Sequence, residues 1–357
     1  MSKKLYSYEL IEALSNAFGP SGCEERVATL ICEQIDDLGI TPIHDKLGNV
    51  IVELKSNRPD AKRLMVSAHM DEVGFMVTEI TDKGYLKIGT VGGISPEVMA
   101  GRHITLEAKN KELIEGIIAS KAIHHKSRED RLKTEKTEKL YVDIGAKDGD
   151  EARDLCDVGS FLSFSQNFSR FGKDHRYLSS KALDDRFGCA LIIELLRKAV
   201  KERDSLPLDL YFCFTTREEV GISGATVAAN SIRPDYAVVL ETTAVADIPD
   251  TPDSSKVAKL GEGGAISLMD RSTIYDKELI ELMLDVAKEN GIKAQVKKYV
   301  SGGNDAGHIH KSTTGVRTLA LSAPTRYLHS PNCVACLDDY DAMLDLLYKF
   351  IFTEKLK

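Results

Sequence analysis

The chain has 357 residues, of which 43% are hydrophobic, so it can bury one large α/β core or two cores of ordinary size. Its 47 basic and 55 acidic residues give a net charge of −8 without long runs of one sign, which argues against nucleic acid or a membrane surface as a partner. The absence of a cleavable leader and of any apolar run of about 18 residues, together with seven scattered cysteines in mostly apolar segments, predicts a cytoplasmic protein in a reducing compartment.

The first quarter of the chain alternates between helix and strand patterns. Residues 5–18 and 23–39 are predicted to be helices, and before the second one Ser21 and Glu24 have the spacing of a capping box. Residues 49–54 and 63–71 are predicted to be strands. The second of these strands is continuously apolar, which favours a place inside a sheet covered on both faces.

The pattern changes after this point and later returns. Residues 73–175 consist of short strand-like segments separated by Gly, Asp and Lys turns. The chain is therefore predicted to form an α/β domain, residues 1–72 and 176–357, interrupted by a β-rich insertion, residues 73–175. In the second part of the α/β domain, helices are expected at 184–200, 223–230, 277–290 and 340–353, and strands at 208–216, 236–241 and 317–323.

Polar residues follow the predicted strands at their carboxyl ends, which is where open α/β sheets bind ligands. His69 and Asp71 end the strand at 63–71. Side chains two residues apart on a strand point the same way, so the carboxylate can lie beside the imidazole. In that position it would fix the tautomer of the ring and strengthen the nitrogen that ligates a metal.

Four further positions carry similar groups, and each has a structural explanation as well as a functional one. The acids at 184–185 could cap a helix, and Glu241 could be a solvated strand end. His329, on a turn beside a proline, could be a surface residue. The adjacent acids Glu218 and Glu219 repel one another as they leave an apolar strand, which favours neutralisation of one of them by a cation.

Taken together, these positions supply two histidines and a surplus of carboxylates from separate strand ends. This is the ligand set of a two-metal hydrolytic site, in which one carboxylate bridges the ions and a further acid serves as general base. Spacing alone does not assign these roles within each acidic pair.

Seven motifs extend this interpretation over essentially the whole chain: AHMDEVGFMV, VGGISPEVMAGR, KALDDRFGCA, TTREEVGISGA, ETTAVADIP, SGGNDAGHI and RYLHSPN. In order and approximate spacing they resemble the M42 family of metallo-aminopeptidases, also labelled glutamyl aminopeptidase or endoglucanase M. One such motif is modestly specific, and seven in register are strongly so.

The resemblance implies a three-layer α/β fold with a mixed central sheet and a barrel-like insertion that serves in oligomerisation, with dimers assembling to a dodecamer. It implies two divalent ions per subunit, zinc first, with cobalt or manganese as alternatives. His69, Asp184 and Glu241 would bind one ion. Asp184, Glu219 and His329 would bind the other, so that Asp184 bridges the two.

The resemblance also implies the reaction. Glu218 would be the general base that activates a water bridging the two metals, and Asp71 the partner of His69. Short peptides with a free N-terminus would be the substrates. The chain departs from the family pattern at three places, where Asp, Thr and an acid are more usual: Glu241, Asn304 and Cys333.

Several alternatives remain open at this stage. A two-metal deacylase of N-acyl amino acids would use similar chemistry. A carboxylate-pair glycosidase would not explain His69 or His329, and a non-catalytic shell protein would not explain an intact ligand set. The preferred N-terminal residue is not assigned, because the basic residues near the motifs are explained equally well as solvated or ion-paired surface residues: Lys181, Arg186, Arg217 and Arg326.

Overall fold

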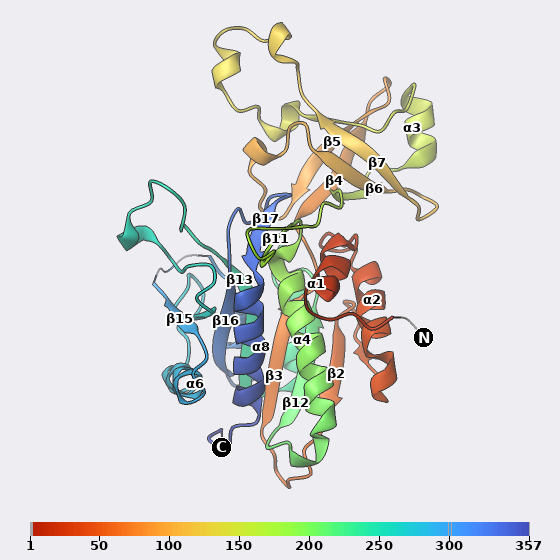
Figure 1. Cartoon of the computed structure of the whole chain (residues 1–357). Helices are drawn as coiled ribbons and strands as arrows, with labels where there is room; N and C mark the ends of the chain where they lie inside the picture. The colour runs from red at the N-terminus through yellow and green to blue at the C-terminus, as the bar shows by residue number, and fades with distance from the viewer. Residues whose placement is uncertain (1–2, 299, 301, 357) are drawn as a thin grey trace.

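A computed structural model describes residues 3–298, 300 and 302–356 of the chain. It confirms the predicted fold class: an α/β body on a mixed central sheet, and a β-rich insertion that closes into a barrel above that body (Figure 1). The predicted helices and strands of the α/β body are present, with ends shifted by a few residues.

The central sheet has the strand order β1-β2-β12-β3-β13-β16-β14-β15. Its middle strands β12, β3, β13 and β16 run parallel, so their carboxyl ends meet at one edge, whereas β1, β2 and the β14–β16 pair are antiparallel. The strands are β1 Ile43–His44, β2 Val50–Leu54, β3 Arg63–His69, β12 Asp209–Thr215, β13 Tyr236–Ala244, β14 Gly264–Ser267, β15 Ala294–Lys297 and β16 Arg317–Thr325.

Helices cover the sheet on both faces, which explains why β13 is buried along all but its last residue. One group consists of α4, which packs on β3 and β13, together with α1, α2 and α8 (Figure 1). A second group, α5 and α7, packs on β3, β12, β13 and β16. The bounds are α1 Ser7–Asn16, α2 Glu25–Ile35, α4 Leu183–Lys201, α5 Ser223–Ile232, α6 Lys277–Glu289, α7 Ala306–Ile309 and α8 Leu337–Ile351.

The insertion forms a closed barrel in the strand order β4-β5-β8-β7-β6-β9, with an apolar core separate from that of the α/β body. A long excursion between β7 and β8 carries three single 3-10 turns. The elements are β4 Gly74–Ile80, β5 Tyr85–Val91, β6 His103–Glu107, β7 Leu113–Ala119, β8 Tyr141–Asp143, α3 Gly149–Leu155 and β9 Phe161–Phe164.

A three-stranded antiparallel sheet, absent from the sequence prediction, lies between the two parts of the fold (Figure 1). It consists of β10 Ser169–Phe171, β11 Tyr177–Ser180 and β17 Cys333–Cys336. Because β11 pairs with β17, the residues that enter α4 lie beside the segment that follows β16. Cys333 and Cys336, which have CxxC spacing, are buried, free thiols on β17.

The predicted capping box before α2 is wrong. The N-cap of α2 is Glu24, and it makes no side-chain cap hydrogen bond. The Ser21 hydroxyl instead donates to Asp71 Oδ2 (2.5 Å), and Glu24 Oε1 accepts from the amide nitrogens of Gly22 (2.8 Å) and Arg217 (3.1 Å). Both side chains are directed at the end of the central sheet and not at the first turn of α2.

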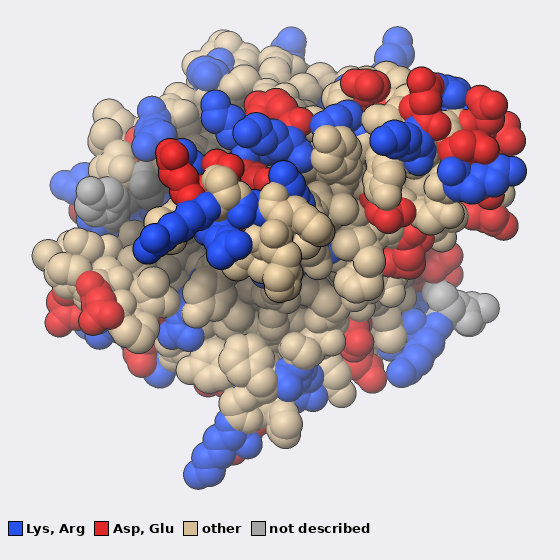
Figure 2. Space-filling model, turned by 90° about the horizontal axis from the view of Figure 1, so that it is seen from above, with Lys and Arg blue, Asp and Glu red and all other residues tan. Residues whose placement is uncertain are grey.

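Among the described residues, no helix is long and apolar enough to cross a membrane. Seen from the barrel side, basic and acidic side chains are intermixed over the surface (Figure 2), as the nearly balanced totals of 47 and 55 require. All seven cysteines are free, and six of them are buried.

Candidate active site

The carboxyl ends of the parallel strands bring together side chains from distant parts of the sequence. His69 is the last residue of β3, and Glu241 lies near the end of β13. Glu219 lies just beyond β12, and His329 beyond β16. Asp184 enters from the start of α4, where it and its neighbour have non-helical backbone angles and share a cis peptide bond.

The side chain of Asp184 lies between the two imidazoles. Its Oδ1 is 3.3 Å from His69 Nε2, and its Oδ2 is 3.3 Å from His329 Nε2. His69 Nε2 also lies 3.6 Å from Glu241 Oε1, and His329 Nε2 lies 3.2 Å from Glu219 Oε1. The side chains thus form two groups, His69 with Asp184 and Glu241, and His329 with Asp184 and Glu219. The two groups share the Asp184 carboxylate, and an imidazole is at the centre of each.

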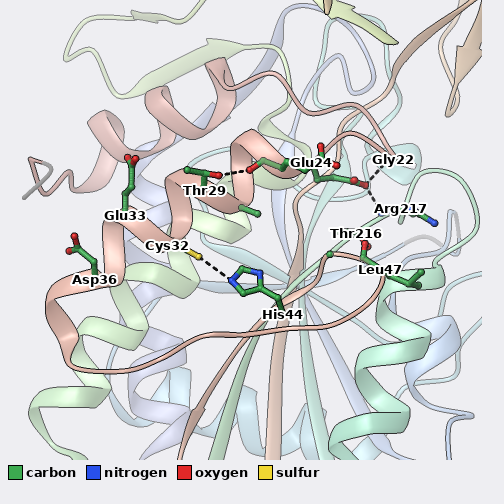
Figure 3. A pocket seen from close by; sticks show the side chains of 13 residues that line it. Gly22, Glu24, Thr29, Cys32, Glu33, Asp36, His44, Leu47, Thr216 and Arg217 are labelled. Carbon is green, nitrogen blue, oxygen red and sulfur yellow. Dashed lines mark hydrogen bonds between the residues drawn. The ribbon is translucent and has the colours of Figure 1, made fainter. Parts of the chain in front are cut away.

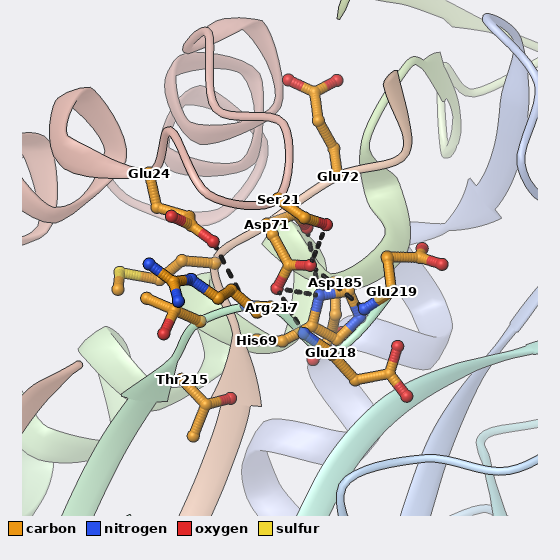
Figure 4. Close-up of polar contacts among 12 residues, drawn as sticks. Ser21, Glu24, His69, Asp71, Glu72, Asp185, Thr215, Arg217, Glu218 and Glu219 are labelled. Carbon is orange, nitrogen blue, oxygen red and sulfur yellow. Dashed lines mark hydrogen bonds and ion pairs between the residues drawn. The ribbon is translucent and has the colours of Figure 1, made fainter. Parts of the chain in front are cut away.

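Asp71 lies behind His69 and is completely buried. Its carbonyl oxygen is 3.0 Å from His69 Nδ1, and its Oδ1 is 3.4 Å from the same nitrogen. The carboxylate also accepts hydrogen bonds from the amides of Glu218 (3.0 Å) and Glu219 (3.1 Å), as Figure 4 shows. Burial alone would raise the pKa of Asp71, but the His69 ring, the Ser21 hydroxyl and the Glu218 amide hold it below its usual value.

The carboxylates at this site carry more negative charge than the two imidazoles can balance. Burial raises the pKa of Glu218 and Glu241 well above the usual range, and neighbouring acids add to the effect. Burial alone would lower the pKa of His329, but Asp184 and Glu219 raise it to about 12. These imidazole nitrogens and carboxylate oxygens form a donor set that suits divalent cations, which would relieve the repulsion.

Two buried acids beside this set were not among the predicted site residues. Asp185 accepts a hydrogen bond from the Gly188 amide, but its Oδ2 has no partner among the described residues. Asp305 accepts from the Thr215 hydroxyl (2.6 Å), and its Oδ1 likewise has none. The DD pair and the GGNDAG motif contained both acids, but only the fold shows that they are buried next to the histidines.

Two of the four basic residues interpreted as surface residues are in fact fully buried, so that interpretation is wrong for them. Lys181 donates to both oxygens of Glu72 at 2.6 and 2.8 Å. Arg186 donates to four backbone carbonyl oxygens around the end of β3 and the segment after α1. Arg326 does form an ion pair, with Asp247 at 2.6 Å.

The barrel also contributes to the site, through the turn that follows β5. The Gly93 carbonyl oxygen lies 2.8 Å from His329 Nδ1, so it can fix the tautomer that leaves Nε2 facing the carboxylates. The neighbouring Gly92 has φ +80°, and a Cβ placed there would lie 2.8 Å from Val73 and 3.3 Å from the Glu219 Cβ. This turn therefore requires glycine for both its conformation and its close approach.

A cavity of about 400 Å³ opens onto the carboxylates. Its lining includes Asp184, Glu218, Glu219 and Glu241, and also Lys297 and Asn304. Asn304 is fixed there by hydrogen bonds to the Tyr275 hydroxyl and the Ala306 amide. The cavity is large enough to admit the end of a peptide, and acids outnumber bases in its lining.

The fold and this site define a metal-dependent hydrolase of the α/β class. Residues 48–346 match the family described as M42 glutamyl aminopeptidase. The chain therefore belongs to the M42 family and is a metallo-aminopeptidase.

Relatives with curated sequences cover the chain almost completely. A protein of Acetivibrio thermocellus is 36% identical over 344 residues, which are 96% of this chain and 98% of that protein. The lysyl aminopeptidase of Pyrococcus furiosus is 30% identical, and the match covers 96% of each chain.

Solved structures agree with the fold. A TET aminopeptidase from a marine sediment archaeon of the Thaumarchaeota superimposes with a TM-score of 0.92 at 33% identity, over 98% of this chain and 96% of the other. The TET1 peptidase of Pyrococcus horikoshii, which can assemble into a tetrahedron or a large octahedral shell, gives 0.86 at 34% identity, over 96% and 98%. A dodecameric PhTET1 structure gives 0.85 at the same identity and coverage.

Proposed function

We propose that the chain is a di-metal aminopeptidase that removes single residues from the N-terminus of short peptides. The observation that carries the proposal is the position of Asp184, whose two oxygens each face one imidazole. We assign His69, Asp184 and Glu241 to one ion, and Asp184, Glu219 and His329 to the other. Zinc is the expected metal, and cobalt and manganese are the alternatives because they accept the same nitrogen and oxygen donors.

The acidic lining of the cavity supports a requirement for a free N-terminus. A peptide ammonium group is attracted to these carboxylates, whereas an acylated terminus carries no charge and a C-terminal carboxylate is repelled. The peptide bond next to the ammonium group then lies beside Glu218. An endopeptidase would need a cavity open at both ends of the substrate backbone.

Glu218 is assigned as the general base. When bound, the two cations would lower the pKa of a water molecule and polarise the carbonyl of the first peptide bond. Glu218 accepts the proton of the attacking water and then donates it to the leaving amine nitrogen. Asp71 holds the backbone amide of Glu218 on one side and the His69 ring on the other, so it orients the base and a ligand together.

We further propose that residues 1–72 and 176–357 form the catalytic domain and that residues 73–175 form the domain through which subunits associate, with a dodecamer as the expected assembly. The resemblance to TET peptidases supports this part of the proposal. Exposed apolar side chains on adjacent barrel strands support it as well: Tyr85, Leu113, Ile117 and Tyr141.

The test is a panel of aminoacyl-p-nitroanilides, their N-acetylated counterparts, N-acyl amino acids and β-glucan, assayed before and after chelation, with metal content measured in parallel. We expect free-amine substrates to be cleaved, activity to vanish on chelation, and zinc, cobalt or manganese to restore it at two ions per chain. Preferential cleavage of N-acyl amino acids would favour a deacylase. Metal-independent cleavage of β-glucan would favour a glycosidase, and either result would contradict the proposal.

A further inference from the structure

The turn at residues 216–219, which carries Glu218 and Glu219, is held by side chains from outside its own strand. Its four successive backbone amides each donate to a side-chain oxygen. Thr216 donates to Asn49 Oδ1 at 2.9 Å and Arg217 to Glu24 Oε1 at 3.1 Å. Both acids of the turn donate to the Asp71 carboxylate, as described above. The direction of Glu218 and Glu219 therefore depends on three buried acceptors.

These side chains hold the amides of the turn, whereas its carbonyls accept from the residues that follow, Arg217 from the Ile222 amide at 2.9 Å and Thr216 from the Gly224 amide at 3.1 Å. On the outer side of the turn a cavity of about 610 Å³ borders Thr216 and Arg217, and Gly22 and Glu24 form part of its wall (Figure 3). Arg217 also has φ +58°, a left-handed conformation that a non-glycine residue adopts only when its surroundings hold it. The turn thus borders a cavity and is held in place by hydrogen bonds.

The segment between α1 and α2 supplies one of these contacts and supports another. Ser21 donates its hydroxyl to Asp71 Oδ2, the same oxygen that accepts from the Glu219 amide. Glu24 accepts from the Arg217 amide, directly before Glu218. In Figure 4 both side chains lie beside the 216–219 turn, one toward Asp71 and the other toward Arg217.

The segment itself is anchored independently of these side chains. Residue 20 forms a parallel bridge with Glu72, in which the Ser21 amide donates to the Glu72 carbonyl at 3.2 Å. In return, the Glu72 amide donates to the Gly19 carbonyl at 3.1 Å. Because backbone bonds fix the segment, substitution of Ser21 should remove one contact, and substitution of Glu24 two, without unfolding the segment.

We propose that Ser21 and Glu24 are positioning residues for the reaction. Ser21 fixes the rotamer of Asp71, Glu24 fixes the peptide before Glu218, and together they aim the general base and a metal ligand. This inference rests on the proposed function, because it explains how Glu218 and Glu219 come to face the cations. Neither residue touches the substrate, so their effect is on turnover and not on binding.

The first test is a double-mutant cycle between Ser21 and Asp71, assayed with the best p-nitroanilide substrate at saturating metal. Loss of one hydrogen bond to a buried carboxylate corresponds to roughly a tenfold fall in kcat for Ser21→Ala. We expect KM and the metal content to stay unchanged. In an Asp71→Ala background, the same Ser21→Ala change should have almost no effect, because the group that it orients is gone.

The second test compares three variants around Glu24. Glu24→Ala should lower kcat, again about tenfold. Glu24→Gln should recover most of the activity, because the amide oxygen can accept the same two backbone hydrogen bonds. Glu25→Ala is the matched control, since Glu25 is the exposed acid directly after Glu24, at the first position of α2, and it should leave kcat unchanged.

The outcomes separate the two proposals. A wild-type chain without metal-dependent aminopeptidase activity would overturn the proposed function itself. An active wild type whose Ser21→Ala and Glu24→Ala variants match it, or lose activity only in proportion to lost metal, would overturn this inference alone. Additive losses of kcat for Ser21→Ala and Asp71→Ala in the double-mutant cycle would also overturn this inference.

Discussion

Asp184 occupies the central position at the scale of single residues, because its two carboxylate oxygens lie 3.3 Å from one histidine each. Its desolvation on burial would raise its pKa, but the two imidazoles and their charge hold the pKa well below the usual range. A carboxylate kept ionised in a buried position is suited to bridging two cations.

The Glu218→Gln variant tests the base directly. The amide keeps the size and shape of the side chain but cannot accept a proton, so we expect kcat to fall by at least about a hundredfold. The two metal ions should remain bound, as measured by elemental analysis of the purified variant. Substantial turnover by Glu218→Gln would remove Glu218 from its role.

The residues of the site could be predicted from the sequence only in part. The seven predicted site residues lie together at the carboxyl edge of the sheet, most of them at or beyond the end of a strand, with Asp184 at the start of α4 and Glu241 inside β13. The positions of Asp185 and Asp305 were not predictable, because their burial depends on how α4 and the segment before α7 pack on the central sheet. Ser21 and Glu24 were misinterpreted as a helix cap because local spacing says nothing about a partner such as Asp71, fifty residues away.

At the scale of elements, the parallel strands of the central sheet are what the sequence predicts best. A long apolar strand has a strong and local signal, and β3, β12, β13 and β16 all have one. The strands missed by the sequence prediction are short and gain their stability from pairing with segments far away in the chain: β1, β14, β15, β10, β11 and β17.

The turn after β5 gives a prediction at this scale. A methyl group at Gly92 would press on Val73 and Glu219, so Gly92→Ala should lower the occupancy of the second metal and reduce activity at least about tenfold. Gly101→Ala is the matched control, because Gly101 has φ +78° with no atom within 4 Å of its Cβ position. If Gly92→Ala and Gly101→Ala lost metal and activity equally relative to the wild type, backbone strain would be the cause and not the approach to Glu219.

At the scale of the whole molecule, the insertion is both a separate body and part of the site. Its core is distinct from that of the α/β body, yet the Gly93 carbonyl contacts His329. The change of pattern along residues 73–175 predicted a β-rich region, and the closed barrel lies within it. The contact with His329 could not be foreseen, because it depends on how the two bodies pack.

The barrel surface supplies the prediction on assembly. Light scattering should give a mass twelve times that of the 39.3 kDa chain. Ile117→Asp places a charge among the exposed apolar side chains of the barrel and should shift the protein to smaller species, because a buried charge without a partner is costly. A monomer in the wild type, or a dodecamer unaffected by the substitution, would contradict the proposed role of the barrel.

The order of the ligands along the chain has a consequence for the synthesis of the protein. The last donor of one metal group in chain order is Glu241. The other group also needs His329, which comes later in the chain. Because translation runs from the N-terminus, a nascent chain acquires the donors of the first group before the second imidazole. On the proposed ligand set, a nascent chain that has not yet reached residue 329 therefore lacks one of the two metal sites and should not hydrolyse peptides.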